Sequence, residues 1–282
     1  MNLFVTGATG FVGSNFLKQA HALGHRIKAL RRRGSHTRIP LDFEVDWVEA
    51  ELDEDLSNHF SEIDCVVHLA SHTPNPPYDT LEKCLYWNVL ASAKLLQTAA
   101  HAGVRKFVAT GTYFEYGSAG DLHERIPPSC ELRPTLSYPI SKAAASVALL
   151  GSARELNLEL QVLRLFQVYG EGEAEKRFWP SLRKAALAGE DFPMSAGTQI
   201  RDFINVSDVA KNICETLKFS EVKPGRPHIR NIGTGKGQSL LTFAQSWWEV
   251  WKAKGRLIPG ALPSRPGERP KLVANIEDIH VA

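Results

Sequence analysis

The sequence predicts an α/β fold in which a doubly wound parallel sheet is followed by a smaller C-terminal lobe. A glycine-rich turn, residues 6–13, lies between an apolar run and a helical pattern at the start of the chain. Short apolar runs then alternate with amphipathic helical stretches as far as about residue 168. That alternation is typical of repeated βαβ units. In such folds, ligands bind beyond the carboxyl ends of the strands.

The expected elements follow from the spacing of apolar residues. Short apolar runs bounded by turn residues predict strands, and longer stretches with helical periodicity predict helices. We expect strands at 3–6, 26–30, 47–50, 65–69, 106–109 and 161–165, and helices at 12–23, 81–101 and 141–156.

The C-terminal part of the chain has a different composition. After Gly170 the alternation gives way to segments rich in glycine, proline and charge. We therefore expect a large domain at 1–168, with a return of the chain to it near 203–218, and a smaller lobe formed mainly by 169–282. Trp247 and Trp251 fall on one helix face, which favours a place in the core of that lobe for the tryptophan cluster around them.

Charge and cysteine content exclude several classes of protein. The chain has 33 lysine and arginine residues against 31 aspartate and glutamate, which gives no reason to expect nucleic acid or a membrane surface as a partner. Its four cysteines are scattered and form no CxxC pair, which favours reduced thiols in a cytoplasmic protein and no metal site. No apolar stretch is long enough to cross a bilayer.

The glycine turn is a candidate cofactor site. Gly7, Gly10 and Gly13 allow a tight turn and let backbone N–H groups approach a pyrophosphate at a helix N-terminus. Their spacing is GxxGxxG. The second predicted strand ends in three arginines, 31–33, where a chain that binds NAD usually has Asp or Glu. Because guanidinium groups pair with a 2′-phosphate, the sequence favours NADP(H).

Tyr138 and Lys142 form a candidate catalytic pair. They are four residues apart at the start of a predicted helix, so the phenol and the ammonium lie on one face. A lysine in that place is expected to lower the Tyr138 pKa and make the phenol an acid or base near neutral pH. Thr112 adds a hydroxyl at the same edge of the sheet.

These residues resemble the extended short-chain dehydrogenase/reductase family, the NAD-dependent epimerase/dehydratase group, whose members act largely on nucleotide-linked sugars. The resemblance covers nearly the whole chain and implies a Rossmann fold, with an NADP-binding domain at 1–168 and a substrate-binding lobe. It is carried, in order, by TGATGFVG at 6–13, HLAS at 68–71, WNV at 87–89, TYFEYG at 112–117, YxxxK at 138–142, LRLFQVYG at 163–170 and RDFINVSDVA at 201–210.

The resemblance also implies residue roles. Tyr138 is expected to donate or accept the proton, Lys142 to be its electrostatic partner, and Thr112 to align the reacting oxygen. Arg201 and Arg265 are expected to hold the diphosphate of a sugar nucleotide. The expected cofactor-binding residues are Gly7, Thr9, Gly10, Phe11, Val12, Gly13, Arg31, Arg32, Ser35, Glu51, Leu52, Leu69, Ala70, Ser71, Asn88, Thr110, Tyr138, Lys142 and Phe166. The expected substrate-binding residues are His72, Thr112, Tyr113, Gln167, Arg201 and Arg265.

Two residues depart from the family pattern. Gln167 replaces the Asn that usually precedes Val-Tyr-Gly, and Glu115 stands where the family often has an apolar residue. The segment 112–117 is most similar to a bacterial subset that acts on deoxysugar nucleotides in O-antigen synthesis, such as CDP-abequose synthase.

Two reactions share these residues. Reduction of a 4-keto nucleotide sugar consumes NADPH, whereas a 4-epimerase oxidises and re-reduces one sugar on a tightly held dinucleotide. Because the arginines at 31–33 favour NADPH, the sequence predicts the ketoreductase first and the epimerase second. A cofactor sensor without activity is a third alternative, against which the intact Thr112, Tyr138 and Lys142 argue. The resemblance further implies a homodimer in which 81–101 and 141–156 form a four-helix bundle with their copies.

Overall fold

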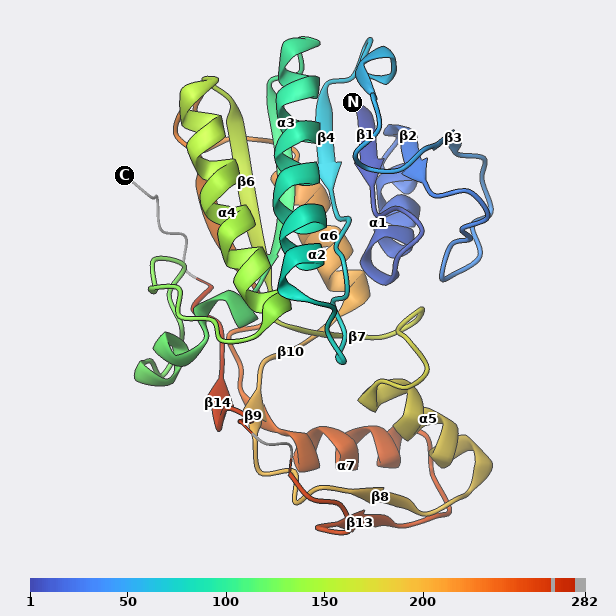
Figure 1. Ribbon diagram of the computed structural model, residues 1–282. Coiled ribbons are helices and arrows are strands. Elements are labelled where there is room, and N and C mark those ends of the chain that lie inside the picture. Colours follow the sequence, from blue (N-terminus) through green and yellow to red (C-terminus); the bar gives the residue numbers. More distant parts are fainter. Residues whose placement is uncertain (265–266, 277–282) are drawn as a thin grey trace.

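The computed structural model describes residues 1–264 and 267–276 and contains a seven-stranded parallel sheet with helices on both faces (Figure 1). The strand order is β11-β6-β5-β4-β1-β2-β3, so the order reverses between β1 and β4. The strands are β1 (Asn2–Thr6), β2 (Arg26–Arg31), β3 (Asp46–Glu49), β4 (Cys65–His68), β5 (Lys106–Thr112), β6 (Glu159–Leu165) and β11 (His228–Ile232). This architecture is the predicted Rossmann-like α/β fold.

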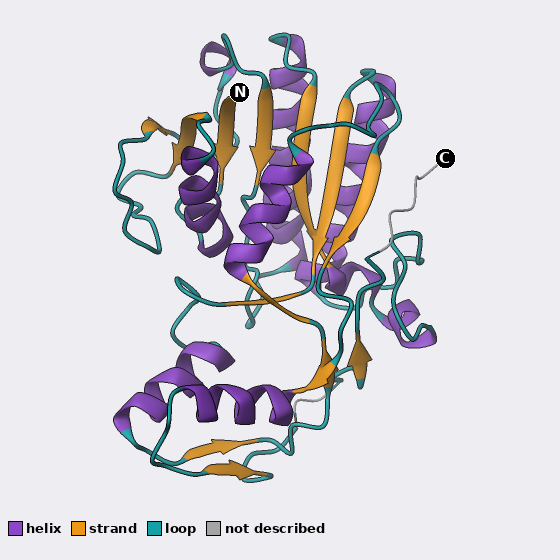
Figure 2. Cartoon of the chain, turned by 180° about the vertical axis from the view of Figure 1, so that it is seen from behind, coloured by secondary structure: helices purple, strands orange, loops and turns teal. Residues whose placement is uncertain are grey.

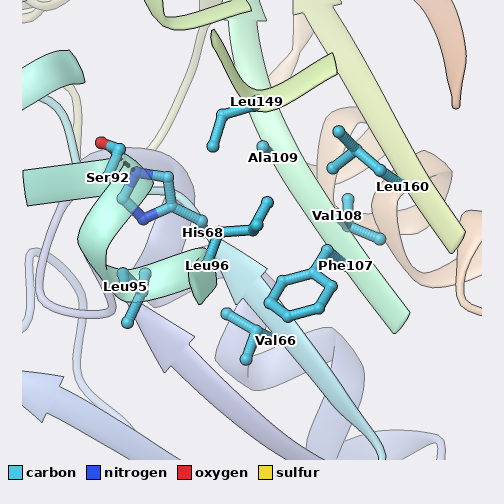
Figure 3. A pocket seen from close by; sticks show the side chains of 10 residues that line it. All are labelled: Val66, His68, Ser92, Leu95, Leu96, Phe107, Val108, Ala109, Leu149 and Leu160. Atoms are coloured by element: carbon cyan, nitrogen blue, oxygen red, sulfur yellow. Dashed lines mark hydrogen bonds between the residues drawn. The ribbon is translucent and has the colours of Figure 1, made fainter. Parts of the chain in front are cut away.

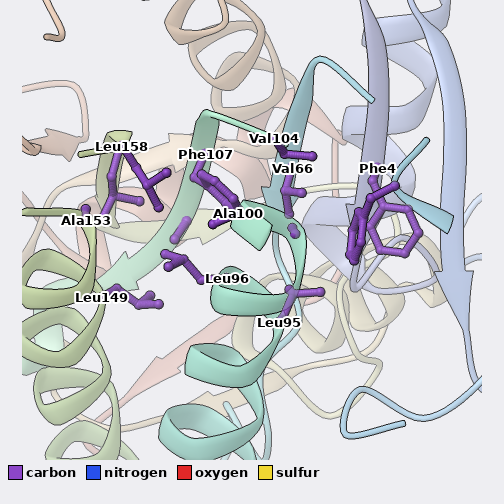
Figure 4. Packing of buried hydrophobic residues seen from close by; sticks show 14 of the residues in the cluster. Phe4, Val66, Leu95, Leu96, Ala100, Val104, Phe107, Leu149, Ala153 and Leu158 are labelled. Atoms are coloured by element: carbon purple, nitrogen blue, oxygen red, sulfur yellow. The ribbon is translucent and has the colours of Figure 1, made fainter. Parts of the chain in front are cut away.

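Alternating side chains of the strands build two separate cores. Phe4 and Val66 point to one face, where they pack with residues of α3 (Ser92–His101) and α4 (Ser137–Glu155), as Figure 4 shows. Their neighbours Val5 and Val67 point to the other face, against α1 (Phe11–Ala22) and α6 (Val206–Thr216). Figure 2 shows α1 and α6 together on that second face. The strands are therefore apolar on both sides, as expected for a buried parallel sheet.

The helical stretch predicted at 81–101 is interrupted. It consists of α2 (Leu81–Leu85), a π-helical segment η2 (Tyr86–Ala91) and α3. Asn88 lies in the π-helical segment and is 3% exposed. A π-bulge inserts one extra residue into a helix and frequently marks a functional site.

The chain returns to the sheet further than predicted. Besides α6, residues 228–232 add the edge strand β11, which pairs with β6. Within the described residues, three small sheets lie outside the main one. They are formed by β7 (Gln167–Tyr169) with β10 (Phe203–Asn205), by β12 (Gln238–Ser239), β9 (Ile200–Arg201) and β14 (Lys271–Leu272), and by β8 (Phe192–Met194) with β13 (Leu257–Pro259).

The segment beyond the sheet has its own core between α5 (Phe178–Ala188) and α7 (Leu240–Val250). Trp247 stacks on Trp251 with ring centroids 5.1 Å apart, and Trp179 meets Trp247 edge-on at 5.6 Å. The tryptophan cluster is core, as predicted. All four cysteines are buried and free, and their assignment to a cytoplasmic protein stays a prediction. No helix in the described part of the chain is long and apolar enough to span a membrane.

Candidate active site

The glycine turn lies between β1 and α1 and is built without space for side chains. A Cβ on Gly13 would lie 2.0 Å from the Gly7 carbonyl oxygen, and one on Gly7 would lie 2.4 Å from the Ala70 nitrogen. Gly7 also has φ of +69°, a conformation that favours glycine. At the Gly10 N-cap of α1 no described side chain accepts a hydrogen bond from the helix. The first-turn N–H groups are therefore available to an anion.

The end of β2 carries the predicted 2′-phosphate contacts. Arg31 Nη2 lies 2.6 Å from Glu49 Oε1 on β3, and the Arg31 guanidinium lies over the Trp47 ring at 5.1 Å. Arg32 is exposed and Ser35 is half-buried beyond it. The Glu49 carboxylate therefore compensates the Arg31 charge, a pairing that the sequence pattern did not predict.

Polar side chains beneath the turn connect β1, β4 and α3. Thr6 Oγ1 lies 2.7 Å from His68 Nδ1, and His68 Nε2 lies 2.9 Å from Ser92 Oγ. Burial, with a smaller effect of the Lys142 charge, lowers the pKa of His68 to about 3, so the ring is neutral. Figure 3 shows His68 and Ser92 at one side of a small cavity that is otherwise lined by apolar side chains of the core. That cavity has no place for a polar ligand.

The catalytic candidates come together at one edge of the sheet, at the end of β5 and the start of α4. Lys142 is buried, and its Nζ donates to the Thr110 carbonyl oxygen at 2.6 Å. Tyr138 is 6% exposed, and its ring lies 5.3 Å from that of Tyr78. Tyr78 was not among the predicted residues, because the sequence around it carries no motif.

The charge environment of Tyr138 differs from the prediction. Burial raises the Tyr138 pKa above its ordinary value, and the hydroxyls of Ser71 and Thr112, as hydrogen-bonding neighbours, lower it in part. Burial also lowers the Lys142 pKa. The expectation of a lowered Tyr138 pKa was therefore wrong in direction, because the removal of water from the phenol is the largest influence on it.

Asn88 connects the loop after β4 to the catalytic helix. Its Oδ1 accepts from the His72 backbone N–H at 2.7 Å, and its Nδ2 donates to Ser141 Oγ at 2.9 Å. Ser141 in turn donates to the Tyr138 carbonyl oxygen. The His72 ring lies 3.1 Å from the Asp79 carboxylate. Asn88 thus holds the loop at 72 and the start of α4 in one arrangement.

Tyr113 contacts other residues that the sequence predicts to bind substrate or cofactor. Its phenol donates to Gln167 Oε1 at 2.9 Å, and its ring stacks on Phe166 with centroids 5.3 Å apart. Burial raises the Tyr113 pKa to about 12, opposed by the positive charges of Arg201 and Arg177. The charges of two guanidinium groups therefore act on this phenol. Arg177, just before α5, is an addition to the predicted residues; its signal was a basic residue at the start of a helix.

Arg201 is held rigidly. It is 8% exposed, its Nη1 donates to the Ile200 carbonyl oxygen at 2.8 Å, and its Nη2 lies 3.7 Å from Glu268 Oε1. The neighbouring Asp202 is fully buried and accepts N–H bonds from Thr234, Gly235 and Ala274. Arg265, the second predicted diphosphate contact, lies outside the described residues.

The remaining predicted cofactor residues follow the edge of the sheet. Leu69, Ala70 and Ser71 continue from β4 directly beside Gly7. Glu51 and Leu52 follow β3, where Leu52 packs against the core. Thr9, Phe11 and Val12 belong to the glycine turn and the first turn of α1. All of them lie at the carboxyl ends of the strands, which is where ligands bind in this fold.

This arrangement fits a dinucleotide at the strand-order reversal and a second ligand beside Tyr138. The glycine turn and uncapped helix start suit a pyrophosphate, and a buried Tyr, Lys and Thr suit proton transfer next to it. Fold and site thus define a dinucleotide-dependent enzyme.

Comparison with known proteins identifies the family. Residues 3–233 match the model of the NAD dependent epimerase/dehydratase family, and the chain belongs to that family. A UDP-glucose 4-epimerase from Corynebacterium glutamicum is 27% identical over 298 residues, covering 98% of this chain and 88% of the relative. One from Azospirillum brasilense is 29% identical over 308 residues, covering 98% and 84%. The structure of MoeE5 in complex with UDP-glucuronic acid and NAD superimposes with a TM-score of 0.83 at 28% identity, covering 98% of this chain and 90% of MoeE5.

These relatives bear on the two predicted reactions. Two of them are UDP-glucose 4-epimerases, and MoeE5 is in complex with UDP-glucuronic acid and NAD. They favour the epimerase, the second of the two reactions expected from the sequence, over the ketoreductase. They support a nicotinamide dinucleotide and a nucleotide-sugar ligand.

Proposed function

We propose that this protein is a nucleotide-sugar 4-epimerase. The observation that carries the proposal is the buried Tyr138 phenol beside the hydroxyls of Ser71 and Thr112, on the helix that also presents Lys142. Similarity to UDP-glucose 4-epimerases over nearly the whole chain supports epimerisation as the reaction.

Thr112, Tyr138 and Lys142 have different roles in the proton transfer. Thr112 holds the oxygen of the sugar 4-hydroxyl by a hydrogen bond, and Tyr138, as the phenolate, takes the hydroxyl proton. Burial raises the Tyr138 pKa, and the positive charge of Lys142 on the same helix face opposes that shift and stabilises the phenolate. The bound dinucleotide supplies hydride chemistry at the sugar carbon. Tyr138 returns the proton to the same oxygen when the opposite face of the 4-keto sugar is reduced, so protons and electrons balance over the cycle.

Two arginines that influence Tyr113 are proposed to hold the nucleotide part of the substrate. The charges of Arg177 and Arg201 both act on the Tyr113 pKa, and two guanidinium groups suit the two phosphates of a nucleoside diphosphate. Each also has a carboxylate partner, Glu173 for Arg177 and Glu268 for Arg201, which a diphosphate would have to compete with. Arg265 is proposed as a further contact. Gln167, which accepts a hydrogen bond from the Tyr113 phenol, is proposed as a contact of the sugar.

A second candidate is NADPH-dependent 4-ketoreduction, which includes activity like that of CDP-abequose synthase. The arginines at 31–33 favour it, because they suit a 2′-phosphate better than ribose hydroxyls. The pairing of Arg31 with Glu49 weakens this support. It reduces the positive charge that a 2′-phosphate would meet.

One experiment separates the candidates. The purified protein is incubated with a UDP-hexose, or with a 4-keto nucleotide sugar and NADPH, and the products are followed by chromatography and NADPH absorbance. Conversion of one hexose into its 4-epimer without net consumption of cofactor supports the proposal. Stoichiometric loss of NADPH with the keto sugar, and no interconversion, contradicts it in favour of reduction.

We further propose a homodimer formed through α2, η2, α3 and α4. Leu90 and Val147 are 62% and 63% exposed on these helices, and Leu81, Tyr86 and Leu136 add further apolar surface nearby. Large exposed apolar side chains gathered on neighbouring elements are typical of protein interfaces.

A further inference from the structure

Glu115 lies directly below the catalytic edge of the sheet. It follows β5 in a short 3-10 segment, η3 (Tyr113–Tyr116). Its Oε1 accepts the backbone N–H of Thr112 at 2.8 Å, while the Thr112 hydroxyl accepts from the Phe114 N–H. This reciprocal capping fixes the backbone that carries the Thr112 hydroxyl.

The other carboxylate oxygen of Glu115 contacts two more elements. Oε2 accepts from Ser146 Oγ at 2.8 Å and from Arg164 Nε at 2.9 Å. Ser146 belongs to α4 and Arg164 to β6. One buried carboxylate thus holds the end of β5, the catalytic helix and the neighbouring strand together.

The position of Ser146 makes this contact relevant to catalysis. Tyr138, Lys142 and Ser146 are spaced at four-residue intervals along α4, so they lie on one helix face. A hydrogen bond from Ser146 to Glu115 therefore fixes the face from which the phenol and the ammonium project.

The carboxylate and its partner Arg164 are both enclosed by the protein. Arg164 and Glu115 are 2% and 0% exposed at their side chains. The guanidinium also donates to the Pro128 carbonyl oxygen at 2.9 Å and lies 4.7 Å over the Tyr116 ring. A Cβ on Gly111 would lie 2.5 Å from Glu115 Oε1, so the glycine before Thr112 leaves room for the acid.

Stability alone is a weak reason for such a pair. The desolvation of two buried charges commonly offsets their attraction, and apolar residues of similar volume are often as good. A geometric role explains why the acid bonds to a catalytic strand end and to a catalytic helix at once.

We propose that Glu115 is a positioning residue, which sets the Thr112 hydroxyl against the Tyr138 phenol by bonding to Thr112 N–H and to Ser146 Oγ. The inference rests on the proposed function, in which these two groups hold one sugar hydroxyl. The Glu115 charge additionally raises the pKa of both Tyr138 and Lys142.

The test replaces the ion pair as a unit, because a lone buried Arg164 would destabilise the fold. The variant E115L/R164M has no acceptor for the Thr112 N–H, whereas E115Q/R164M keeps an amide oxygen there. We expect the first to lose about 10- to 100-fold in kcat, with KM for the nucleotide sugar unchanged, and the second to recover most of that loss. Ser146→Ala should lower kcat in the same way by a smaller factor.

The control is Thr216→Val, which removes a buried hydroxyl bonded to the Ile213 carbonyl oxygen on α6, on the opposite face of the sheet. It should leave kcat unchanged. Equal kcat values in the two double variants would overturn the proposal. If the double variants do not fold, a wild-type kcat in Ser146→Ala would overturn it instead.

A second readout does not depend on turnover. In protein labelled with fluorotyrosine, the fluorine resonance of Tyr138 is assigned by its loss in Tyr138→Phe. We expect it to shift or broaden in E115L/R164M and in Ser146→Ala, and to return toward its wild-type position in E115Q/R164M. An unmoved resonance in folded E115L/R164M, or in Ser146→Ala if the pair variants do not fold, overturns the positioning role. If the wild type converts no nucleotide sugar, the proposed function fails while this comparison still decides the role of Glu115.

Discussion

Arg31 and Glu49 face each other at the ends of neighbouring strands, with Nη2 and Oε1 2.6 Å apart. They are register partners in the β2–β3 pairing, and the Arg31 guanidinium also lies over Trp47. Both contacts hold Arg31 in place and compensate its charge. A 2′-phosphate at this edge would therefore depend chiefly on the exposed Arg32.

Arg32→Ala is expected to raise the Kd for NADPH about tenfold, which corresponds to about 1.4 kcal/mol, and to leave the Kd for NADH unchanged. Glu49→Gln should lower the Kd for NADPH, because it releases the Arg31 charge. Titration of each variant with both reduced cofactors checks this. Arg26→Ala, at the opposite end of β2, is the control. Unchanged NADPH binding in Arg32→Ala would exclude Arg32 as a phosphate contact.

Tyr138→Phe is expected to lower kcat by about 10²- to 10⁴-fold, the usual effect of losing a positioned acid or base. Cofactor affinity should change little, since only one oxygen is removed from a buried ring. Steady-state kinetics and cofactor titration measure the two effects separately. Tyr86→Phe removes the exposed phenol that donates to Asp53 and serves as the control. Wild-type turnover in Tyr138→Phe would disprove the proton-transfer role.

Gly7→Ala is expected to destabilise the fold and abolish cofactor binding. The added Cβ would lie 2.4 Å from the Ala70 nitrogen, and the alanine would also have to adopt a backbone φ of +69°. Gly24→Ala has nearly the same strain, with φ of +78°, but nothing within 4 Å of its Cβ. The control should lose only about 1 to 2 kcal/mol. If thermal unfolding shows that both variants lose the same amount of stability, the close packing of the turn against residues 69–70 is not the reason that position 7 requires glycine.

Local signals explain what the sequence predicted. The glycine turn, the early strands and the four-residue spacing of Tyr138 and Lys142 each depend on neighbouring residues, and all were found where expected. The edge strand β11 was missed because its sequence, HIRNI, has only two apolar residues, and its partner, β6, lies more than 60 residues earlier.

Long-range pairing explains what the sequence did not predict. Glu49 reaches Arg31, and Glu115 reaches Arg164, only after the strand order has placed them side by side. Glu115 was visible in the sequence as a departure from the family pattern, but its partners were not. The sign of the Tyr138 pKa shift was missed for a related reason: spacing reveals a neighbouring charge but not the loss of water around the phenol.

Acid is expected to destabilise the protein through His68. Burial lowers its folded-state pKa to about 3 from an ordinary 6.5. Between these pH values the unfolded chain binds a proton that the folded chain does not, so the free energy of unfolding falls as pH falls. The slope contributed is at most about 1.4 kcal/mol per pH unit. Urea unfolding between pH 7 and pH 4 measures it.

The variant His68→Gln isolates this effect. It should be less stable than wild type at pH 7 by about 1 to 3 kcal/mol, because one of two buried hydrogen bonds is lost, and the difference should shrink as pH falls. Glu173, whose pKa burial raises to about 7, has the opposite pH dependence but is present in both proteins and cancels. His101→Gln, at an exposed site, is the control. Parallel curves for wild type and His68→Gln would show that His68 does not carry the acid sensitivity.

A negative charge introduced on the exposed apolar face of η2 or α4 is expected to dissociate the proposed dimer. Leu90→Glu and Val147→Glu place carboxylates on exposed apolar positions of η2 and α4. In a monomer they cost little, since both positions face water, whereas in a bundle they bury unpaired charge. Leu187→Glu, at a position 61% exposed on α5, is the matched control. Sedimentation analysis should give a dimer for the wild type and control and a monomer for the two variants. A monomeric wild type, or dimers throughout, would refute this interface.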